Sequence, residues 1–383
     1  MMTGDCRPET VDCRLMTNKA LYQIALTFIP GVGVMHARNL LQVMGDEESV
    51  FKGDIRRLEA IPGISRRLIG EIRNAEVLRK AEKELQFVDK NKLRLLFVGS
   101  PGYPERLANC VDAPIVLYAK GDVDFNREKI ISIVGTRNAT DYGVRSCRKF
   151  VSELAGRFPD MMIISGLAYG IDICAHRAAL ESGLSTVAVL GHGLDRIYPY
   201  IHRHTAVEMI ENGALLTEFT SGTGPERHHF VRRNRIVAGM ADAVVVIESG
   251  EKGGSLITAD IANSYYREVF ALPGRVSDRW SSGCNRLITD NKAVLLQDTD
   301  QFIAYMGWEP ASMPSVAVQK ELFTDLTEEE ERVVLVLKKA ESMQVNALAI
   351  ELNTPVSELF FTLLELEIKN VVESLPGGMY KLM

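Results

Sequence analysis

This chain of 383 residues lacks the features that assign a sequence to several common classes of protein. Its six cysteines form no CxxC pair and show no regular spacing, so we interpret them as free thiols in a reducing compartment. The first residues contain no apolar core of signal-peptide length. No uninterrupted apolar run reaches the length that spans a membrane. We therefore expect a cytoplasmic protein that does not enter a membrane.

An excess of positive charge is also missing, because the formal net charge is −6 at pH 7. This value argues against a uniformly basic nucleic-acid-binding protein, but it is compatible with a local basic patch because the field at a cleft depends on nearby charges. Two common nucleotide-binding loops are absent as well. The glycine after Gly135 is Gly143, which does not fit GxGxxG, and no Gly-Lys-Ser/Thr follows at the Walker A spacing. We therefore expect no cofactor.

What the chain does contain is a repeated pattern in its middle third, residues 130–274. Four short apolar, β-branched runs each end at a glycine-containing segment, and three of them lead directly into a helical pattern. Repetition of strand, glycine turn and helix predicts an α/β fold with a doubly wound parallel sheet. Ligands of such sheets bind outside the carboxyl ends of the strands, where helix N-termini present unpaired N–H groups. The pattern therefore predicts a row of anion-binding turns along one sheet edge.

The candidate binding residues lie in these turns and in one basic helix. Arg137 follows the first strand, and its planar fork of donors suits phosphate recognition, with a plain surface arginine as the alternative reading. The arginine-rich run at residues 226–235 opens a helix, for which a solvated helix face is the alternative to anion contact. The other predicted contacts are Gly135, Thr136, Ser165, Gly166, Gly170, Gly191, Gly193, Arg233, Asn234, Arg235, Gly254 and Ser255.

The histidines of this region are predicted neither to act in catalysis nor to bind metal. His176 has no nucleophile in a fixed relation to it, so a structural or ligand-contacting role is the better interpretation. His192, His202 and His204 do not match the spacing of a standard metal site. We therefore predict no catalytic residue and no metal ligand in this chain.

The segment before the sheet is predicted to be a helical domain, residues 1–90. It contains a helix–hairpin–helix-like Pro-Gly-Val-Gly at residues 30–33 and a degenerate second copy, Pro-Gly-Ile-Ser, at residues 62–65. The glycines would let backbone N–H groups approach a phosphate, but a helical packing module with tight turns explains the pattern as well. Two short strands, at residues 93–98 and 115–118, are expected at an edge of the main sheet or as its extension, within a domain that spans residues 91–308.

The last part of the chain is predicted to be a winged-helix domain, residues 322–383, that follows a linker at residues 309–321. Three helical segments and a Pro-Gly-Gly hairpin support this prediction, and Thr327 with Glu330 forms a capping box at the start of the first helix. The third helix has more carboxylates than cations, a balance that opposes attraction to phosphate. The residues concerned are Glu358, Glu365, Glu367 and Lys369.

Taken in order, the segments VGTRNATDYG, SGLAYGIDICAH, VLGHGLDRIYP, RNRIVAGM, GGSLITA and LPG resemble the DNA-processing protein A family, also called Smf. The resemblance implies a helical N-terminal domain of helix–hairpin–helix or SAM-like type and often a C-terminal winged helix. Between them it implies an extended Rossmann-like domain that binds single-stranded DNA without nucleotide hydrolysis. It further implies a homodimer that loads a RecA-type recombinase during natural transformation.

The resemblance also implies two roles for individual residues. Arg137 matches the arginine of the family's Gly-Ser/Thr-Arg motif, which contacts DNA, and Arg177 falls where the family often has a basic residue. This chain departs from the family pattern at three positions, none of which removes a predicted contact. Val231 replaces a usual proline, Gly253 a usual serine and Lys292 a usual glycine.

Two other functions remain open on the sequence. A nucleotide-processing enzyme of phosphoribohydrolase type carries a Pro-Gly-Gly-x-Gly-Thr phosphate loop, which Gly253-Gly254-Ser255 partly matches. A transcriptional regulator would act through the winged helix, a function that the acidic third helix disfavours. The leading hypothesis is a protein without enzymatic activity that binds single-stranded DNA.

Overall fold

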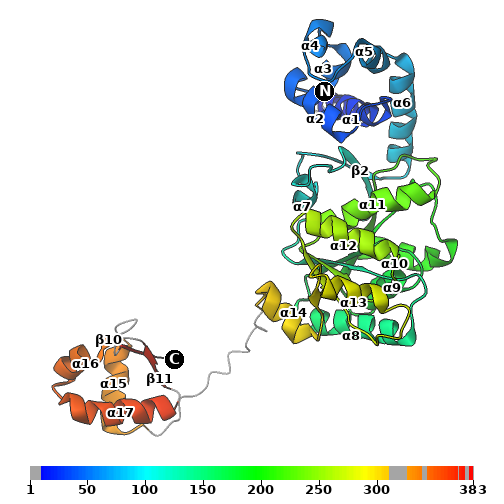
Figure 1. Cartoon of the computed structure of the whole chain (residues 1–383). Coiled ribbons are helices and arrows are strands. Elements are labelled where there is room, and N and C mark those ends of the chain that lie inside the picture. The colour runs from blue at the N-terminus through cyan, green and yellow to red at the C-terminus, as the bar shows by residue number, and fades with distance from the viewer. Residues whose placement is uncertain (1–9, 310–325, 339–342, 370, 376–378, 383) are drawn as a thin grey trace, which may run out of the picture. The chain divides into compact units, whose positions relative to one another are not determined.

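The computed structural model describes residues 10–309, 326–338, 343–369, 371–375 and 379–382. The chain divides into two compact units, residues 1–311 and residues 312–383, each with a hydrophobic core of its own. The first unit combines N-terminal helices with a large sheet that helices cover on both faces, and the second is a small winged helix (Figure 1). The predicted fold class is therefore confirmed, including the N-terminal helices and the winged helix.

Short helices with polar capping residues make up the N-terminal region. The side chains of Asp46, Asp54, Ser65 and Asn74 each accept a hydrogen bond from an N–H group in the first turn of a helix, where no backbone partner is present. The helices are α1 (Thr10–Phe28), α2 (Val34–Met44), α3 (Glu47–Lys52), α4 (Ile55–Glu59), α5 (Arg66–Ile72) and α6 (Ala75–Lys90).

The internal repeat predicted in this region has a structural basis. Gly31 and Gly63 occupy equivalent turns and both have a positive φ, of 81° and 84°, which favours glycine. Two residues later, Gly33 and Ser65 stand at the N-caps of α2 and α5. Ser65 accepts a hydrogen bond from the N–H of Leu68 (3.2 Å), so the serine of the second copy supplies the cap that a glycine cannot supply.

The N-terminal helices share a hydrophobic core with the first strands of the sheet. Phe97, Ile115, Val116 and Tyr118 belong to the same buried cluster as the apolar residues of these helices. The boundary predicted at residue 90 coincides with the end of α6, but this cluster continues across it. The helical region and the sheet therefore form one compact unit.

The large sheet has nine strands in the order β1-β2-β6-β5-β4-β3-β7-β8-β9. Strands β3 to β9 pair in parallel, whereas β1 and β2 form an antiparallel extension at one edge, as the sequence predicts. The strands are β1 (Arg94–Phe97), β2 (Val116–Lys120), β3 (Ile130–Val134), β4 (Met162–Ser165), β5 (Ser185–Val189), β6 (Gly213–Thr217), β7 (Ala243–Val246), β8 (Glu268–Ala271) and β9 (Val294–Leu295).

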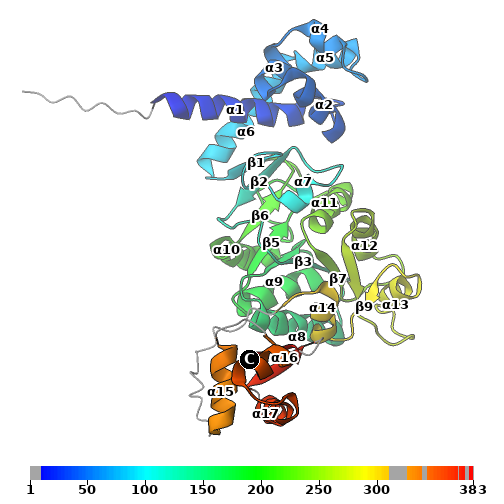
Figure 2. The same ribbon diagram turned by 90° about the vertical axis from the view of Figure 1, so that its left-hand side faces the viewer.

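Helices cover both faces of this sheet because alternate strand residues point to opposite sides. Ile131 and Ile133 pack with α8, α9 and α14, whereas Ile130 and Val134 pack with α11, α12 and α13. Helices α11 and α12 lie together along one side of the sheet (Figure 2). The elements are α7 (Glu105–Ala108), α8 (Asp141–Arg157), α9 (Ile171–Glu181), the 3-10 helix η1 (Tyr200–His202), α10 (Arg203–Glu211), α11 (Arg227–Gly239), α12 (Gly254–Ser264), α13 (Ser282–Thr289) and α14 (Thr299–Met306).

The second unit packs three helices against a three-stranded sheet of order β10-β12-β11. The predicted capping box is present, because Thr327 accepts from the N–H of Glu330 and the Glu330 carboxylate accepts from the N–H of Thr327. No single helix in the described ranges of the chain is long and apolar enough to cross a membrane, although α16 and α17, bent by 108°, pass that test as a pair. The elements are α15 (Glu328–Leu337), β10 (Met343–Gln344), α16 (Val345–Leu352), α17 (Val356–Ile368), β11 (Val372–Leu375) and β12 (Met379–Leu382).

Candidate nucleic-acid interface

The carboxyl ends of β3 and β7 mark the point at which the order of the sheet reverses. β3 pairs with β4 on one side and with β7 on the other, so the chain moves outward through β4, β5 and β6 before it crosses back to β7. Crevices outside such switch points are the usual ligand sites of doubly wound sheets. A pocket of about 580 Å³ lies there, between the turns after β3 and β7 and the starts of α11 and α12. We call it the switch-point pocket.

The switch-point pocket gathers half of the contact residues predicted from the sequence. They come from three separate segments, which the parallel sheet brings to one edge. The predicted residues that line it are Gly135, Thr136, Arg137, Arg233, Asn234, Gly254 and Ser255. The others lie outside its lining: Ser165, Gly166, Gly170, Arg177, Gly191, Gly193 and Arg235. Contact of any of these residues with DNA stays a prediction.

Arg137 stands at the mouth of the pocket as an exposed cation. Its guanidinium lies over the ring of Phe230, 5.6 Å from the centroid, and it makes no ion pair with a described carboxylate. The preceding turn is fixed by the backbone, since the N–H of Thr136 donates to the carbonyl of Glu248 (2.7 Å). Arg137 is therefore held on a rigid turn with its donors available to a ligand.

A buried pair of opposite charges forms part of the wall. Arg233 and Asp172 are only 4% and 7% exposed. Burial raises the pKa of the Asp172 carboxyl, and the nearby charge of Arg233 opposes that rise. Arg233 donates from Nη1 to the carbonyl of Val189, whereas its buried Nε has no hydrogen-bond partner among the described residues. The pair therefore leaves one donor unsatisfied beside the pocket.

Several of the predicted glycines are required by the packing of the protein itself. A Cβ at Gly166 would overlap with the guanidinium of Arg233, and one at Gly170, where φ is 74°, would overlap with the carbonyl of Thr136. A Cβ at Gly191 would come within 2.8 Å of the ring of Phe230. These glycines thus position the residues that line the pocket.

Two predicted arginines lie apart from the pocket and are paired within the protein. Arg235 is 8% exposed and forms an ion pair with Glu218 at 2.6 Å. Arg177 donates from Nε to the hydroxyl of Thr205 (3.3 Å) and lines a separate hollow whose other charged groups include three glutamates. These three glutamates are Glu181, Glu208 and Glu211. Phosphate would meet carboxylates beside Arg177, so this residue is the least favourable of the predicted contacts.

Ser165 and His176 have structural roles in the layer below the pocket. The Ser165 hydroxyl donates to the carbonyl of Ile133 (2.6 Å). His176 is fully buried, its Nε2 accepts from the N–H of Leu167 (3.3 Å), and its Nδ1 lies 2.7 Å from the Thr186 hydroxyl. Burial lowers the pKa of His176 to about 3, so the imidazole is neutral at physiological pH.

The pocket also includes residues that the sequence analysis did not select. Arg227 and Lys252 add two cations, while Phe230 and Trp280 add aromatic surface. The ring of Trp280 packs on Gly250, where a Cβ would come within 3.3 Å of that ring. The backbone carbonyl of Trp280 accepts a hydrogen bond from the N–H of Ser249 (2.7 Å). Arg227 belongs to the basic run at residues 226–235, so its place in the pocket could be predicted from the sequence. Nothing in the sequence pattern indicates Trp280, which reaches the pocket from the loop before α13.

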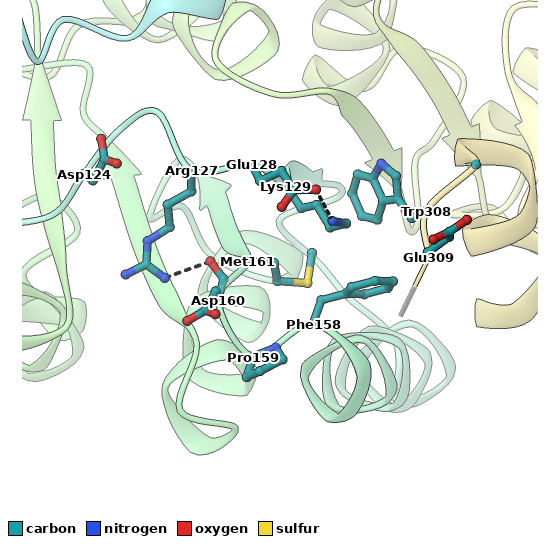
Figure 3. Close-up of a pocket in the computed structure, with 11 residues that line it drawn as sticks. Asp124, Arg127, Glu128, Lys129, Phe158, Pro159, Asp160, Met161, Trp308 and Glu309 are labelled. Atoms are coloured by element: carbon teal, nitrogen blue, oxygen red, sulfur yellow. Dashed lines mark hydrogen bonds and ion pairs between the residues drawn. The ribbon is translucent and has the colours of Figure 1, made fainter. Parts of the chain in front are cut away.

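A larger hollow of about 770 Å³ lies at the opposite edge of the sheet (Figure 3). It surrounds the residues that precede β3 and β4, so it is at the amino ends of the strands rather than at their ligand-binding edge. Its cations are engaged internally. Arg127 donates to the carbonyl of Asp160 (2.8 Å), and Lys129 pairs with Glu128 (2.5 Å) and lies over the ring of Phe158. The switch-point pocket is therefore the better candidate for an anionic ligand.

Comparison with known proteins assigns this architecture to a family. The family model described as DNA recombination-mediator protein A matches residues 94–307, more than half of the chain, and that of the DprA winged helix domain matches residues 320–378. The chain belongs to the DNA recombination-mediator protein A family. The resemblance found in the sequence motifs is thereby confirmed, and both matches cover the parts of the chain in which the sheet and the winged helix are found.

Individual relatives agree with this assignment. Protein Smf of Synechocystis sp. is 34% identical over 303 residues, which make up 77% of this chain and 75% of that protein. The X-ray structure of DNA processing protein A from Streptococcus pneumoniae has a TM-score of 0.60 and 30% identity, and the match covers 74% of this chain and 97% of that chain. A structure of DNA processing protein A from Helicobacter pylori, which concerns the single-stranded DNA binding mode of that protein, has a TM-score of 0.51 and 29% identity over 56% of this chain and 95% of that chain.

Proposed function

We propose that this member of the family binds single-stranded DNA in the switch-point pocket, without enzymatic turnover, and protects it in the cytoplasm. The composition of the pocket supports the proposal. Four cations, Arg137, Arg227, Arg233 and Lys252, line it against a single carboxylate, Asp172. Phosphate neutralisation supplies much of the affinity of such proteins, so a local excess of cations suits a phosphate chain even in a protein whose net charge is −6.

Aromatic groups in the same pocket favour single strands over duplex. Phe230 lies beneath Arg137, and Trp280 lies at the end of the loop before α13. Unpaired bases stack on aromatic faces, whereas paired bases are already stacked within the duplex. Arg233 is buried in the wall, so it adds its charge to the field in the pocket rather than an exposed donor. The contacts are to phosphates and base faces, so we expect little dependence on sequence.

The proposal extends to the biological role. A DNA-binding protein of this family would load a RecA-type recombinase onto the bound strand during natural transformation or recombination, and it would act as a homodimer. The family description as a recombination mediator supports the first part of this role. Analytical ultracentrifugation tests the dimer, and a strand-exchange assay with the host recombinase tests the loading.

Titration of a fluorescently labelled oligothymidylate at two salt concentrations tests the DNA-binding proposal. We expect binding that weakens with salt, and we expect Arg137→Ala to lower the affinity about tenfold and to flatten the log–log salt dependence by roughly one unit or less. The matched control is Arg148→Ala, because Arg148 is an exposed arginine on α8 outside the pocket lining. Equal affinities and slopes for the wild type and a folded Arg137→Ala variant would contradict the assignment of Arg137.

Intrinsic fluorescence locates the binding site independently. The chain has two tryptophans, of which Trp280 lines the switch-point pocket and Trp308 lines the hollow at the opposite edge. In a Trp308→Phe variant, oligonucleotide binding should change the remaining emission, whereas in Trp280→Phe it should change little. Incubation with nucleoside monophosphates tests the enzymatic alternative, because release of free base would favour a phosphoribohydrolase over a binding protein.

A further inference from the structure

Helix α17 of the winged helix has two apolar faces, only one of which is covered. Leu359, Leu363 and Leu366 are buried in the core of the second unit. On the other side, apolar side chains stand in solvent, with exposed fractions of 49% to 74%. They are Phe360, Phe361, Leu364 and Ile368, and we call them the α17 ridge.

The α17 ridge is continuous along the helix. Residues 360, 364 and 368 follow a spacing of four, and at about 100° per residue the whole ridge occupies an arc of about 100°. Phe360 and Phe361 are the exposed phenylalanines of the described residues, since every other described phenylalanine is buried or half-buried. Single exposed apolar residues are ordinary, but a contiguous exposed stripe of large side chains marks an interaction surface.

Carboxylates flank the ridge on both sides. Helical geometry places Glu358 and Glu365 along one flank and Glu367 along the other. Glu358 and Glu365 are exposed, and Glu367 accepts a hydrogen bond from the Ser374 hydroxyl (2.7 Å). The surface is therefore an apolar strip with two carboxylates along one flank and one along the other.

This arrangement selects among the possible occupants. DNA phosphates would meet carboxylates where a reading helix normally brings cations. Anionic membrane surfaces attract helices with Lys and Arg on the polar face, which is the opposite sign. A second copy of α17 would place glutamate against glutamate. An amphipathic helix with an apolar face bordered by lysine or arginine matches both the strip and its flanks.

We propose that the α17 ridge is the docking surface for a basic amphipathic helix of a partner protein. The apolar strip supplies the buried contact, and Glu358, Glu365 and Glu367 set the orientation and exclude acidic segments. This proposal is independent of the switch-point pocket, which lies entirely in the first unit. The winged helix thereby becomes a protein-binding module, whether or not the first unit binds DNA.

Fluorescence anisotropy with the full-length protein and designed peptides tests the proposal. The probe is a labelled amphipathic peptide with leucines on one face and flanking lysines, and the controls are the same peptide with a scrambled order and a version with flanking glutamates. We expect saturable binding of the lysine-flanked peptide alone. Binding of the scrambled peptide with equal affinity, or no binding of the lysine-flanked one, would overturn the proposal.

Two sets of variants assign the binding to α17. Phe361→Ser with Leu364→Ser should weaken peptide binding at least tenfold, whereas Ile350→Ser, an exposed apolar residue on α16, should leave it unchanged. Glu358→Lys with Glu365→Lys should lower the affinity for the lysine-flanked peptide and raise the affinity for the glutamate-flanked one. This charge exchange alters exposed side chains only, so it remains decisive if the serine variant fails to fold, as circular dichroism would show. Unchanged affinities in the charge variant would overturn the proposal.

The remaining occupants are tested with the same variants. We replace the peptide with vesicles of phosphatidylglycerol and phosphatidylcholine or with a duplex oligonucleotide. Sedimentation of the protein alone measures self-association. Binding to vesicles or duplex, or self-association, that the Phe361→Ser and Leu364→Ser substitutions abolish would overturn the proposal in favour of that occupant. We expect the two serine substitutions to abolish peptide binding and to leave the behaviour toward vesicles, toward duplex and in sedimentation the same as in the wild type.

Discussion

At the scale of single residues, the arginines of the basic run differ mainly in burial. Arg227 and Arg232 are exposed, whereas Arg233 and Arg235 are buried against the sheet with internal partners. A buried cation whose neighbouring carboxylate is also buried contributes to stability as a unit, because removal of one member leaves the other uncompensated. Arg233 thus affects the fold as well as the wall of the pocket.

We expect Arg233→Met to lower the free energy of unfolding of the first unit by about 1–3 kcal/mol, since it leaves the buried carbonyl of Val189 without a donor and the buried Asp172 without its neighbouring charge. Urea unfolding followed by tryptophan fluorescence measures this, because both tryptophans belong to residues 1–311. Arg137→Met is the control and should change stability little. The double variant with Asp172→Asn should regain part of the loss, and additive losses would show that the two charges are not coupled.

The buried His176 predicts a specific dependence of stability on pH. Its folded-state pKa is about 3, below the usual 6.5, because burial disfavours the charged form. Because the pKa of His176 is lower in the folded state, its contribution to the free energy of unfolding is fully present above about pH 6.5. This contribution is lost as the pH falls toward the folded-state pKa. Protonation would also place a proton on Nε2, which already faces the N–H of Leu167.

From pH 7 to pH 5 this one residue should cost about 2 kcal/mol of unfolding free energy, at about 1.4 kcal/mol per pH unit below its unfolded pKa. Urea unfolding of the wild type and of His176→Gln at both pH values isolates the effect from other titrating groups. The His176→Gln variant should lose less stability between the two pH values, and His204→Gln, at an exposed position, should behave like the wild type. Equal losses in all three proteins would exclude His176 as the cause.

Much of the residue-level detail could not be predicted from the sequence because it depends on contacts between distant segments. Gly166 matches the expectation of a glycine at a ligand-binding turn, yet it makes room for Arg233, which lies on another helix. The burial of Arg233 could be predicted in part, since its spacing from Ile236 and Val237 places it on the buried face of α11. The pairing of Arg235 with Glu218 depends on a strand end elsewhere in the sheet, which no local pattern indicates.

At the scale of elements, the start of α8 is fixed by a carboxylate from the turn after β7. Glu248 is 2% exposed and accepts from the N–H of Thr140 (2.9 Å) and from its hydroxyl (2.5 Å). A negative group at a helix N-terminus is favourable to the helix dipole. Gly143 is close to this carboxylate, and a Cβ there would overlap with it.

We therefore expect Gly143→Ala to destabilise the first unit by about 1–3 kcal/mol, because overpacking outweighs the higher helix propensity of alanine. Gly156→Ala on the same helix is the matched control, since a Cβ at Gly156 meets no heavy atom within 4 Å. That control should be neutral or slightly stabilising. Thermal unfolding followed by tryptophan fluorescence measures both variants, and a Gly143→Ala protein as stable as Gly156→Ala would contradict the role of Glu248.

The elements themselves were largely predictable because their patterns are local. The four apolar runs of the middle third became β3, β4, β5 and β7, and each is buried on both faces, as expected of a parallel sheet covered by helices. Residues of the glycine turns after β3 and β7 line the switch-point pocket, and binding of a ligand at this edge stays a prediction. What the pattern could not provide was strand order, since β7 lies beside β3 rather than beside β6, which precedes it in the chain.

At the scale of the whole molecule, the switch-point pocket and the winged helix belong to different compact units. All residues that line the pocket lie within residues 134–280, and the second unit has its own core of buried apolar residues. The charges of the second unit also oppose a role in DNA binding. Exposed carboxylates outnumber exposed cations on its described helices and their caps: Glu329, Glu331, Glu351, Glu358 and Glu365 against Arg332 and Lys338.

Deletion of residues 312–383 should therefore leave most of the affinity for single-stranded DNA intact. The pocket keeps its four cations, and the lost surface is one that repels phosphate rather than one that neutralises it. The full-length and truncated proteins are compared in one oligothymidylate titration, with urea unfolding by tryptophan fluorescence as the control that the first unit remains folded. A loss of tenfold or more, about 1.4 kcal/mol, in a truncated protein of unchanged stability would show that the winged helix contacts DNA. Loss of binding to the lysine-flanked peptide in the same truncated protein, with DNA affinity retained, would place the two activities in separate units.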